Sequence, residues 1–340
     1  MFWTLQTLSD FPDRLRGAYV VVGNFDGVHR GHRDLLQRAS KFAEIDDRFL
    51  VALTFDPHPR SVLTPRAPFL QLTSHEEKCR LLKEAGVDDV VTLSFDAELA
   101  SLWPSAFVEL VLAEHMAAKA IVAGQNFCFG LNRAGSIAEL AQVAPDAGLS
   151  VHIVPPLCSM DGGEIITSEL IRSRLTVGDI KGANHLLGRR WTIEGEVVHG
   201  DKRGRQLGFP TANLAPNHNA QFGFGIYAVR VLLNGEILNG VACYGTRPQF
   251  DDGAPRIEVH ILDFAGDIYG ERLLVEFVAF QRSERTFSGV EALMQQIDQD
   301  CLMTRRLLSA DPEVDSVLKR RAGTFASTAA GARGQSAITL

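Results

Sequence analysis

Short apolar runs separated by amphipathic stretches fill the first half of the chain. Residues 18–22 read AYVVV, residues 49–55 read FLVALTF, and the amphipathic stretch 33–43 lies between them. The alternation continues through 74–86, 90–95, 104–116, 120–124, 136–144 and 151–156. Continuously apolar strands that are separated by helices of about ten residues are typical of a parallel sheet covered on both faces. The sequence therefore predicts a doubly wound α/β domain over residues 1–187.

The pattern changes near Gly188. From there the runs are strand-like and separated by turn residues, and they cover 226–233, 234–245, 256–264 and 272–280. Only the stretch 289–308 is clearly helical. These features predict a small antiparallel β-barrel closed by one C-terminal helix over residues 188–310. The remaining residues, 311–340, end in small and polar side chains with little to bury, which predicts a flexible tail.

Composition narrows the classes of partner. The 340 residues, 46% of them hydrophobic, suffice for two domains with cores of their own. The formal net charge of −7 disfavours binding to nucleic acid or an anionic membrane, whereas a local basic pocket could still hold a small phosphorylated substrate. The five cysteines are scattered and form no C-x-x-C pair, which predicts neither a disulfide framework nor a zinc site. The sequence also shows no leader and no long apolar run, and together these features predict a cytoplasmic protein. Self-association is left open.

The stretch GNFDGVHRGH, residues 23–32, directly follows the apolar run that ends at Val22. A strand that turns through glycines into a helix presents free backbone N–H groups and the positive end of the helix dipole, and such a site binds anions. His29 and His32 are three residues apart and would face the same way on the first helical turn, where both can donate to phosphate oxygens. Taken alone, the motif fits better a tight turn with two surface histidines. It is not a Walker A loop, because no G-K-[ST] follows the glycines.

Several motifs together resemble those of the bacterial bifunctional riboflavin kinase/FAD synthetases. GNFDGVHRGH is similar to the H-x-G-H nucleotidyltransferase signature, and three further motifs follow in the family's order: TFDPHP (54–59), VAGQNFCFGLNRAG (122–135) and ITSELIRSRL (166–175). The second half adds the highly specific run GDKRGRQLGFPTANL (200–214), followed by GIYAV (225–229), GTRPQF (245–250) and EVHILDFAGDIYGE (258–271). The resemblance covers residues 18–308 and implies a nucleotidyltransferase domain followed by a kinase domain.

In this family the N-terminal domain moves the AMP of ATP onto the phosphate of FMN and releases pyrophosphate. The resemblance implies that His29 and His32 contact the ATP phosphates, and that Ser168 and Arg172 grip the triphosphate. The guanidinium of Arg172 suits this role because it can bind phosphate in a bidentate manner, although outside this context Arg172 would be interpreted as a solvated helix residue. The other implied binding residues are Gly23, Asn24, Phe25, Asp26, Gly31, His58 and Asn126.

One position of this half departs from the family pattern. Where the last motif usually reads S-S-T-x-I-R, this chain has Glu169 in the run TSELIR, residues 167–172. A carboxylate beside a triphosphate repels it, by roughly a few kcal/mol in a poorly solvated site. Three alternatives are open: Glu169 points away, binds magnesium, or weakens the synthetase.

The C-terminal module of the family phosphorylates riboflavin with ATP and magnesium. Thr211 and Asn213 are two residues apart, so on an extended segment both side chains face one way, and by resemblance they bind Mg²⁺. Glu258 lies on a strand whose other face is apolar; by resemblance it is the base that accepts the riboflavin hydroxyl proton, and alone it would be interpreted as an outward-facing carboxylate. The preceding loop is either a basic surface hairpin or, by resemblance, a phosphate-binding loop that includes Gly200, Lys202, Arg205, Gly208 and Pro210.

Three further departures lie in the kinase half: Cys243 replaces the usual Asn, Gln249 the usual Thr, and FQRSE (280–284) the usual FLRPE. They bear on riboflavin affinity and leave the metal and base positions intact.

The leading hypothesis is a bifunctional enzyme that makes FMN and then FAD, with ATP, riboflavin and FMN as substrates. The alternatives are a single surviving activity, riboflavin kinase with a synthetase weakened by Glu169, and a non-catalytic flavin-binding sensor.

Overall fold

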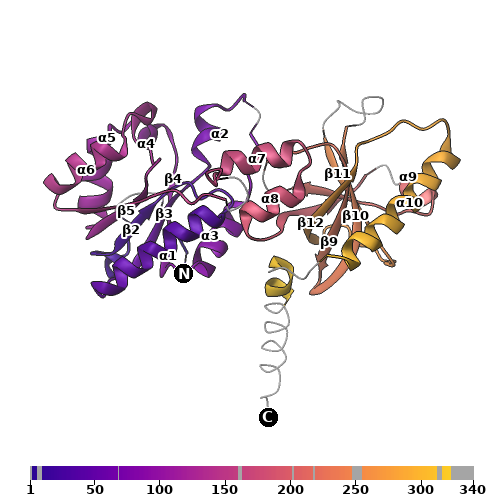
Figure 1. The fold of residues 1–340 in the computed structure, drawn as a ribbon, viewed down its shortest axis with the longest axis horizontal. Helices are drawn as coiled ribbons and strands as arrows, with labels where there is room; N and C mark the ends of the chain where they lie inside the picture. Colours follow the sequence, from indigo (N-terminus) through magenta and orange to yellow (C-terminus); the bar gives the residue numbers. More distant parts are fainter. Residues whose placement is uncertain are drawn as a thin grey trace, which may run out of the picture. The chain divides into compact units, whose positions relative to one another are not determined.

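The computed structural model describes residues 2–5, 10–67, 69–159, 163–200, 203–216, 219–246, 255–311 and 316–322, whose arrangement is drawn in Figure 1. Lys202, Gln249 and residues 312–315 and 323–340 of the predicted tail lie outside these described residues. The chain forms two compact units. The first is Met1–Phe69 with Thr73–Ser168, and the second is Leu70–Leu72 with Glu169–Leu340.

The first unit is built on a six-stranded sheet in which every described strand pairing is parallel. The strands are β1 (Phe2–Leu5), β2 (Tyr19–Val22), β3 (Leu50–Asp56), β4 (Asp89–Ser94), β5 (Ala120–Gly124) and β6 (Ser150–Val154). Their order across the sheet is β1-β4-β3-β2-β5-β6, so the predicted doubly wound parallel sheet is confirmed. The winding direction reverses between β2 and β5, and in sheets of this kind ligands bind at that point, outside the carboxyl ends of the strands.

Helices cover both faces of this sheet. Alternate residues of each central strand pack with α1 (Arg30–Ile45) and α3 (His75–Glu84), and the others pack with the π-helical η3 (Phe107–His115) and with α6 (Ile137–Asp146). Because successive strand residues point to opposite faces, one continuous apolar run supplies both cores. The shorter elements are η2 (Asp13–Leu15), α2 (Pro59–Leu63), α4 (Ala97–Ser101), α5 (Pro104–Ala106) and η4 (Leu131–Arg133).

The second unit is a closed barrel of six strands with antiparallel pairings, followed by a C-terminal helix, as predicted. The strands are β7 (Trp191–Val198), β8 (Ala212–Pro216), β9 (Gly225–Leu233), β10 (Glu236–Gly245), β11 (Arg256–Ile261) and β12 (Arg272–Arg282), in the order β10-β11-β8-β7-β12-β9. The helix α10 (Val290–Ser309) packs against β9, β10 and β12. In the part of the chain that the structure describes, no helix is both long and apolar enough to cross a membrane.

The boundary between the units differs from the predicted limit at residues 187/188. The helix α7 (Ser168–Thr176) begins in the first unit, but from Glu169 onward the chain, with α8 (Ile180–Leu187), belongs to the barrel unit. The reason is packing. The buried side chain of Asn184 on α8 donates from Nδ2 to the carbonyl oxygen of Phe277 (3.0 Å) and accepts from the N–H of Trp191 (2.7 Å), which fastens α8 to β12 and β7.

A three-residue segment, Leu70–Leu72, also belongs to the barrel unit, although both of its sequence neighbours belong to the first unit. Leu72 is fully buried, and its carbonyl oxygen accepts a hydrogen bond from Trp191 Nε1 at 3.0 Å. The carbonyl oxygen of Leu70 accepts from Arg172 Nε at 2.7 Å, and the N–H of Gln71 donates to the carbonyl oxygen of Asn219 at 3.0 Å. Each residue of the segment is therefore held by a hydrogen bond within the second unit.

Part of the predicted flexible tail is packed on the barrel. Residues 317–322 are helical, and the side chains of Val317 and Leu318 are buried against β9 and β12. Asp311 forms ion pairs with two arginines of the barrel unit, Arg190 and Arg230. The expectation of a flexible segment does not hold for these residues, because two apolar side chains and a set of buried ion pairs anchor them.

Candidate active sites

The turn between β2 and α1 carries the two histidines singled out in the sequence. Phe25 and Val28 adopt positive φ angles of 49° and 38°, and the turn leads into α1 with His29 as its N-cap. The His29 Nδ1 atom accepts a hydrogen bond from the N–H of His32 at 3.3 Å, and the two rings stack with their centroids 3.6 Å apart. A neutral His29 therefore carries its proton on Nε2. As expected, both histidines lie on one side of the first helical turn, at the positive end of α1.

Two glycines make this turn sterically possible. A Cβ atom on Gly31 would lie 3.1 Å from the carbonyl oxygen of Ile166 and 3.2 Å from the ring of His29. A Cβ atom on Gly23 would lie 3.0 Å from the ring of Phe25. Because both residues lack a side chain, the Ile166 carbonyl oxygen and the His29 ring can lie close to Gly31, and the Phe25 ring close to Gly23. These close contacts hold the histidine rings in place.

Asp26 fastens the turn to the rest of the first unit. Its side chain is only 3% exposed, and Oδ1 accepts hydrogen bonds from the N–H of Thr73 at 3.2 Å and from the Thr73 hydroxyl at 3.5 Å. The same hydroxyl oxygen accepts from the N–H of Gly27, and the Ser168 hydroxyl donates to the carbonyl oxygen of Asp26 at 2.9 Å. Asp26 and Ser168, predicted to bind nucleotide, thus also contact each other. Thr73 was missed by sequence reasoning because nothing in its local pattern distinguishes it.

The other predicted residues of this site follow neighbouring strands. Asn24 lies in the turn after β2, and its carbonyl oxygen accepts from the Thr54 hydroxyl. His58 follows β3 and caps α2, with Nδ1 accepting from the N–H of Arg60 at 3.1 Å. Asn126 follows β5 and is exposed. Because β3, β2 and β5 are adjacent and parallel, these residues emerge at one edge of the sheet, where its winding direction reverses.

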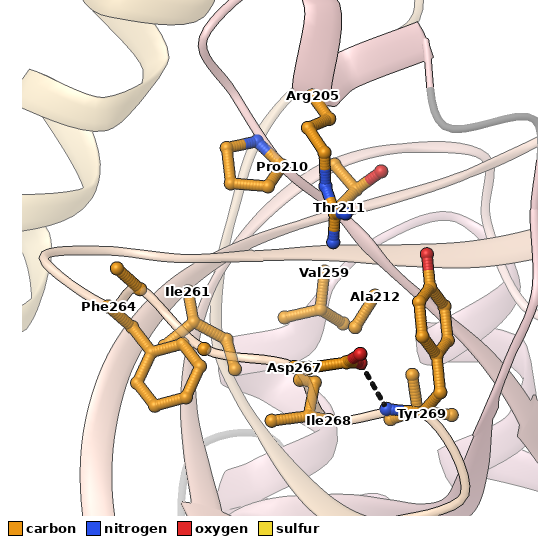
Figure 2. Close-up of a pocket in the computed structure, with 13 residues that line it drawn as sticks. Arg205, Pro210, Thr211, Ala212, Val259, Ile261, Phe264, Asp267, Ile268 and Tyr269 are labelled. Atoms are coloured by element: carbon orange, nitrogen blue, oxygen red, sulfur yellow. Dashed lines mark hydrogen bonds between the residues drawn. The ribbon is translucent and has the colours of Figure 1, made fainter.

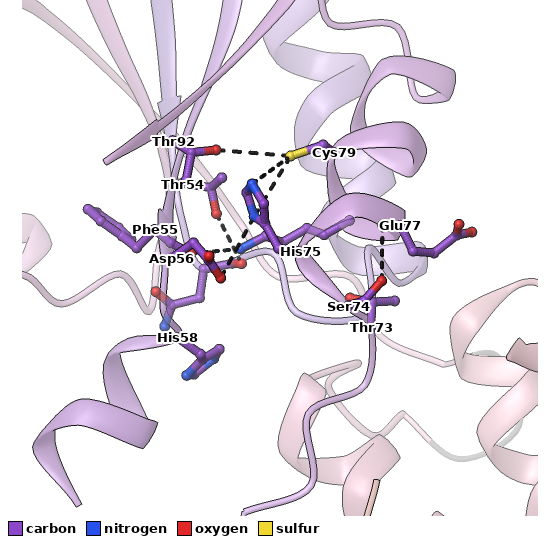
Figure 3. A network of polar contacts seen from close by, with 12 residues as sticks. Thr54, Phe55, Asp56, His58, Thr73, Ser74, His75, Glu77, Cys79 and Thr92 are labelled. Carbon is purple, nitrogen blue, oxygen red and sulfur yellow. Dashed lines mark hydrogen bonds and ion pairs between the residues drawn. The ribbon is translucent and has the colours of Figure 1, made fainter. Parts of the chain in front are cut away.

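A buried lysine next to this turn was not anticipated. Lys78, in the first turn of α3, is 4% exposed and donates from Nζ to the carbonyl oxygen of Phe55 at 2.9 Å. Burial lowers the pKa of Lys78, and the carboxylates of Asp26 and Asp56 act in the opposite direction. Figure 3 shows polar contacts in the same part of the first unit, where His75 Nδ1 lies 3.9 Å from Asp56 Oδ1. The only sequence signal is that Lys78 shares the apolar stripe of its helix, three residues before Leu81.

Arg172 and Glu169 belong to the second unit, whereas the histidine turn belongs to the first. Arg172 is not a solvated helix residue: its side chain is 12% exposed, and Nη1 donates to Glu169 Oε2 at 2.9 Å while Nε binds the carbonyl oxygen of Leu70. The Glu169 side chain is 70% exposed. The structure therefore places the unusual carboxylate in an ion pair with the arginine of its own motif.

In the barrel unit, Thr211, directly before β8, lies close to Glu258 on β11, which pairs with β8. Asn213 on β8 is directly paired with Glu258 on β11, so both side chains point to one side of the sheet. The Thr211 hydroxyl lies 3.3 Å from Glu258 Oε2 and donates to it. Asn213 Oδ1 is buried and accepts no hydrogen bond from any residue that the structure describes. Gly200 makes room for this amide, since a Cβ atom there would lie 2.2 Å from Asn213 Nδ2.

A buried amide oxygen without a donor and a hydroxyl oxygen beside a carboxylate are hard oxygen ligands, which Mg²⁺ prefers. The residues present therefore fit the magnesium ion that the sequence resemblance implies.

A cavity of about 270 Å³ adjoins Thr211, and Figure 2 shows it from close by. Arg205 and Pro210 lie on the Thr211 side, and the turn with Asp267 and Tyr269 lies opposite. The Asp267 carboxylate accepts from the N–H of Tyr269 at 3.3 Å, which closes this turn. The rest of the lining is largely apolar: Val197, Ala212, Val259, Ile261, Phe264, Ala265, Gly266 and Ile268. A flat aromatic group suits such walls, and a cation and a hydroxyl at the rim suit an attached anion.

The remaining predicted loop residues shape the entry to β8. Gly208 has a φ angle of 86°, which favours glycine, and the carbonyl oxygen of Pro210 accepts a hydrogen bond from His260 Nδ1 at 2.8 Å. Among the departures, Cys243 on β10 is the direct partner of Glu258 on β11, so it adjoins the predicted base. Arg282 of the FQRSE run pairs with Asp300 through both carboxylate oxygens, at 2.8 and 2.6 Å, and so ties β12 to α10.

Comparison with known proteins identifies both units. The family model for FAD synthetase matches residues 11–169, and the family model for riboflavin kinase matches residues 187–308. The bifunctional riboflavin kinase/FMN adenylyltransferase of Escherichia coli K12 is 37% identical over 303 residues, which cover 88% of this chain and 95% of that protein. The protein of the same name from Listeria monocytogenes is 39% identical over 290 residues, which cover 84% and 91%.

One solved structure is similar to this chain over most of its length. A crystal structure from Streptococcus pneumoniae, described as a macrolide-efflux protein, has a TM-score of 0.78 and 34% sequence identity, and the match covers 89% of this chain and 98% of that one. Both family models and the named relatives agree with the motifs and with the two folds. This chain belongs to the family of bifunctional riboflavin kinase/FMN adenylyltransferases.

Proposed function

We propose that this chain makes FMN and then FAD: the barrel unit phosphorylates riboflavin with ATP, and the parallel-sheet unit transfers AMP from a second ATP to FMN and releases pyrophosphate. The observation that carries the proposal is the convergence of Thr211, Asn213 and Glu258 beside the cavity in the barrel unit. A protein that only bound flavin would need neither a buried oxygen ligand set nor an adjacent carboxylate base.

In the kinase reaction, Glu258 accepts the proton of the terminal ribityl hydroxyl as its oxygen attacks the γ-phosphorus of ATP, and ADP leaves. The Thr211 hydroxyl donates to Glu258, which keeps the carboxylate oriented and leaves the lone pairs of the Thr211 oxygen for a cation. Asn213 Oδ1 and Thr211 Oγ1 would hold Mg²⁺, which when bound neutralises charge on the phosphate oxygens. The apolar cavity next to Thr211 would take the adenine of ATP, and Arg205 at its rim its phosphates.

In the adenylyl transfer, a phosphate oxygen of FMN attacks the α-phosphorus of ATP, and the bond to pyrophosphate breaks. No covalent protein intermediate is required, because the enzyme orients two anions and stabilises the charge between them. The stacked rings of His29 and His32 would contribute N–H donors, and the first backbone N–H groups of α1 add positive potential. Ser168 and Arg172 are proposed to hold the triphosphate.

Three finer points belong to the same proposal. Mg²⁺ and ATP serve both sites, the protein acts in the cytoplasm, and its partners are small molecules and not nucleic acid. The net charge of −7 and the scattered cysteines support the latter two points.

The direct test incubates the purified chain with riboflavin and Mg-ATP and follows FMN and FAD by chromatography. FMN should appear first and FAD after it. Changing Glu258→Gln should lower FMN formation by about 10²- to 10⁴-fold, because it removes the base, while conversion of supplied FMN to FAD stays within about twofold. If FMN forms but FAD does not, only the riboflavin kinase assignment stands. If the chain binds flavin but forms neither product, both assignments are refuted.

A further inference from the structure

Two aromatic rings meet beside the cavity of the barrel unit. His199 directly follows β7, and its ring lies against that of Tyr269, with the ring centroids 3.9 Å apart and the ring planes inclined by 41°. Tyr269 lies in the turn before β12 and is one of the residues that line the cavity (Figure 2). His199 is exposed, so this contact contributes little to the hydrophobic core.

The backbone of the Tyr269 turn is held by hydrogen bonds. The Gly270 N–H donates to the carbonyl oxygen of Val197, and the Val197 N–H donates to the carbonyl oxygen of Glu271, both at 2.9 Å. The Asp267 carboxylate accepts from the Tyr269 N–H at 3.3 Å. These bonds fix the path of the turn beside β7, but a backbone hydrogen bond does not select the rotamer of a side chain. The contact with His199 acts on the Tyr269 ring itself.

The position of this ring matters because the ring forms part of the wall of the cavity proposed to take the adenine of ATP. Immobilising one such side chain when a ligand binds weakens the affinity by about two- to tenfold. A ring that a neighbour already holds avoids this loss. We propose that His199 is a positioning residue of the kinase site: by its contact with Tyr269 it keeps the cavity wall in the form that binds ATP, and so lowers the KM for ATP. This inference rests on the proposed kinase activity.

The residue after His199 has a different effect on the same site. Gly200 packs against the amide of Asn213, the proposed magnesium ligand, whereas the His199 ring contacts the cavity wall. His199→Ala removes the ring and leaves Gly200 and its contact with Asn213 in place. We therefore expect a loss of His199 to weaken ATP binding and to leave the rate of the chemical step unchanged.

The test measures riboflavin phosphorylation by the full chain at saturating riboflavin and varied Mg-ATP. His199→Ala should raise the KM for ATP by about three- to tenfold and change kcat by less than about twofold. His199→Phe, which keeps a flat ring against Tyr269, should restore both constants to within about twofold of the unmodified chain. The KM for ATP in FAD formation from supplied FMN is the internal control. It should be the same in all three proteins, because His199 does not belong to the parallel-sheet unit.

A second comparison tests whether His199 acts through Tyr269. In a chain that already carries Tyr269→Ala, His199→Ala should raise the KM for ATP by less than about twofold further, because the partner ring is gone. An unmodified chain that forms no FMN from riboflavin would refute the proposed function. If that chain does form FMN, three results would each refute the role of His199 alone: an unchanged KM for ATP in His199→Ala, a KM that His199→Phe does not restore, or an equal rise in KM with and without Tyr269.

Discussion

Gly200 offers a sharp test of the proposed magnesium site, because a single methyl group would act on one ligand. A Cβ atom at Gly200 would lie 2.2 Å from Nδ2, 2.5 Å from Cγ and 2.8 Å from Oδ1 of Asn213. All three distances are below ordinary van der Waals contact, so the amide must move by about 1 Å to accommodate Gly200→Ala. The Asn213 side chain is 9% exposed and faces the Glu258 strand, so it cannot move without shifting Oδ1.

A displacement of about 1 Å at a reacting centre typically costs about 10²-fold in rate, which corresponds to about 2.7 kcal/mol of transition-state stabilisation. We therefore expect Gly200→Ala to lower the rate of FMN formation by about 10²-fold and to raise the Mg²⁺ concentration needed for half-maximal rate. The assay follows FMN by chromatography over a Mg²⁺ titration. Formation of FAD from supplied FMN should be unchanged, because Gly200 lies in the other unit.

The matched control is Gly289→Ala. Gly289 precedes α10 in the same unit, has extended backbone at φ −178°, and has nothing within 4 Å of an added Cβ atom. This variant should keep full riboflavin kinase activity. If Gly200→Ala stays within about threefold of the unmodified chain at every Mg²⁺ concentration, then Asn213 is not a ligand on which the reaction depends.

Three further predictions concern the two units separately. His29→Ala should lower FAD formation from FMN by about 10²- to 10³-fold and leave riboflavin phosphorylation intact; an unchanged FAD-forming rate would remove the phosphate role of this histidine. Glu169→Thr should change kcat/KM for FAD formation by less than about fivefold, because the Glu169 side chain is exposed and exposed ion pairs contribute little; a larger gain would show that Glu169 repels the triphosphate. Burial raises the pKa of Glu276 above 4.5, so its contribution to stability is fully present below pH 4.5 and is lost as pH rises through the raised pKa. Glu276→Gln should remove this loss, so the thermal midpoint of the barrel unit should fall less between pH 4.5 and pH 7 in the variant than in the unmodified chain. An equal fall in both proteins would contradict this prediction.

Local patterns in the sequence predict most of the fold. The doubly wound sheet follows from continuous apolar runs, because each run supplies both faces of a strand that is covered on both sides. The pairing of His29 with His32 follows from their spacing on a helical turn, and the common direction of Thr211 and Asn213 follows from strand periodicity.

Contacts between residues far apart in the sequence could not be predicted in this way. Thr73 is 47 residues from Asp26, and Trp191 is 119 residues from Leu72, so neither contact leaves a periodic signal. Lys78 is a charged residue that α3 buries, and its Nζ atom donates to the carbonyl oxygen of Phe55, 23 residues earlier in the chain, a contact that local periodicity does not reveal. The packed residues 317–322 were missed because only two of their side chains, Val317 and Leu318, are large and apolar, too few to mark a helix face.

The buried segment Leu70–Leu72 affects whether the two enzymatic units of this chain can be separated by cutting the chain between them. A single cut after Ser168 would remove these three residues from the unit that holds them, leaving the Trp191 indole N–H without its acceptor and the space of Leu72 empty. A new start codon after Ser168 would therefore not release an intact kinase half. Removing the first unit by truncation is therefore expected to weaken the riboflavin kinase unit as well.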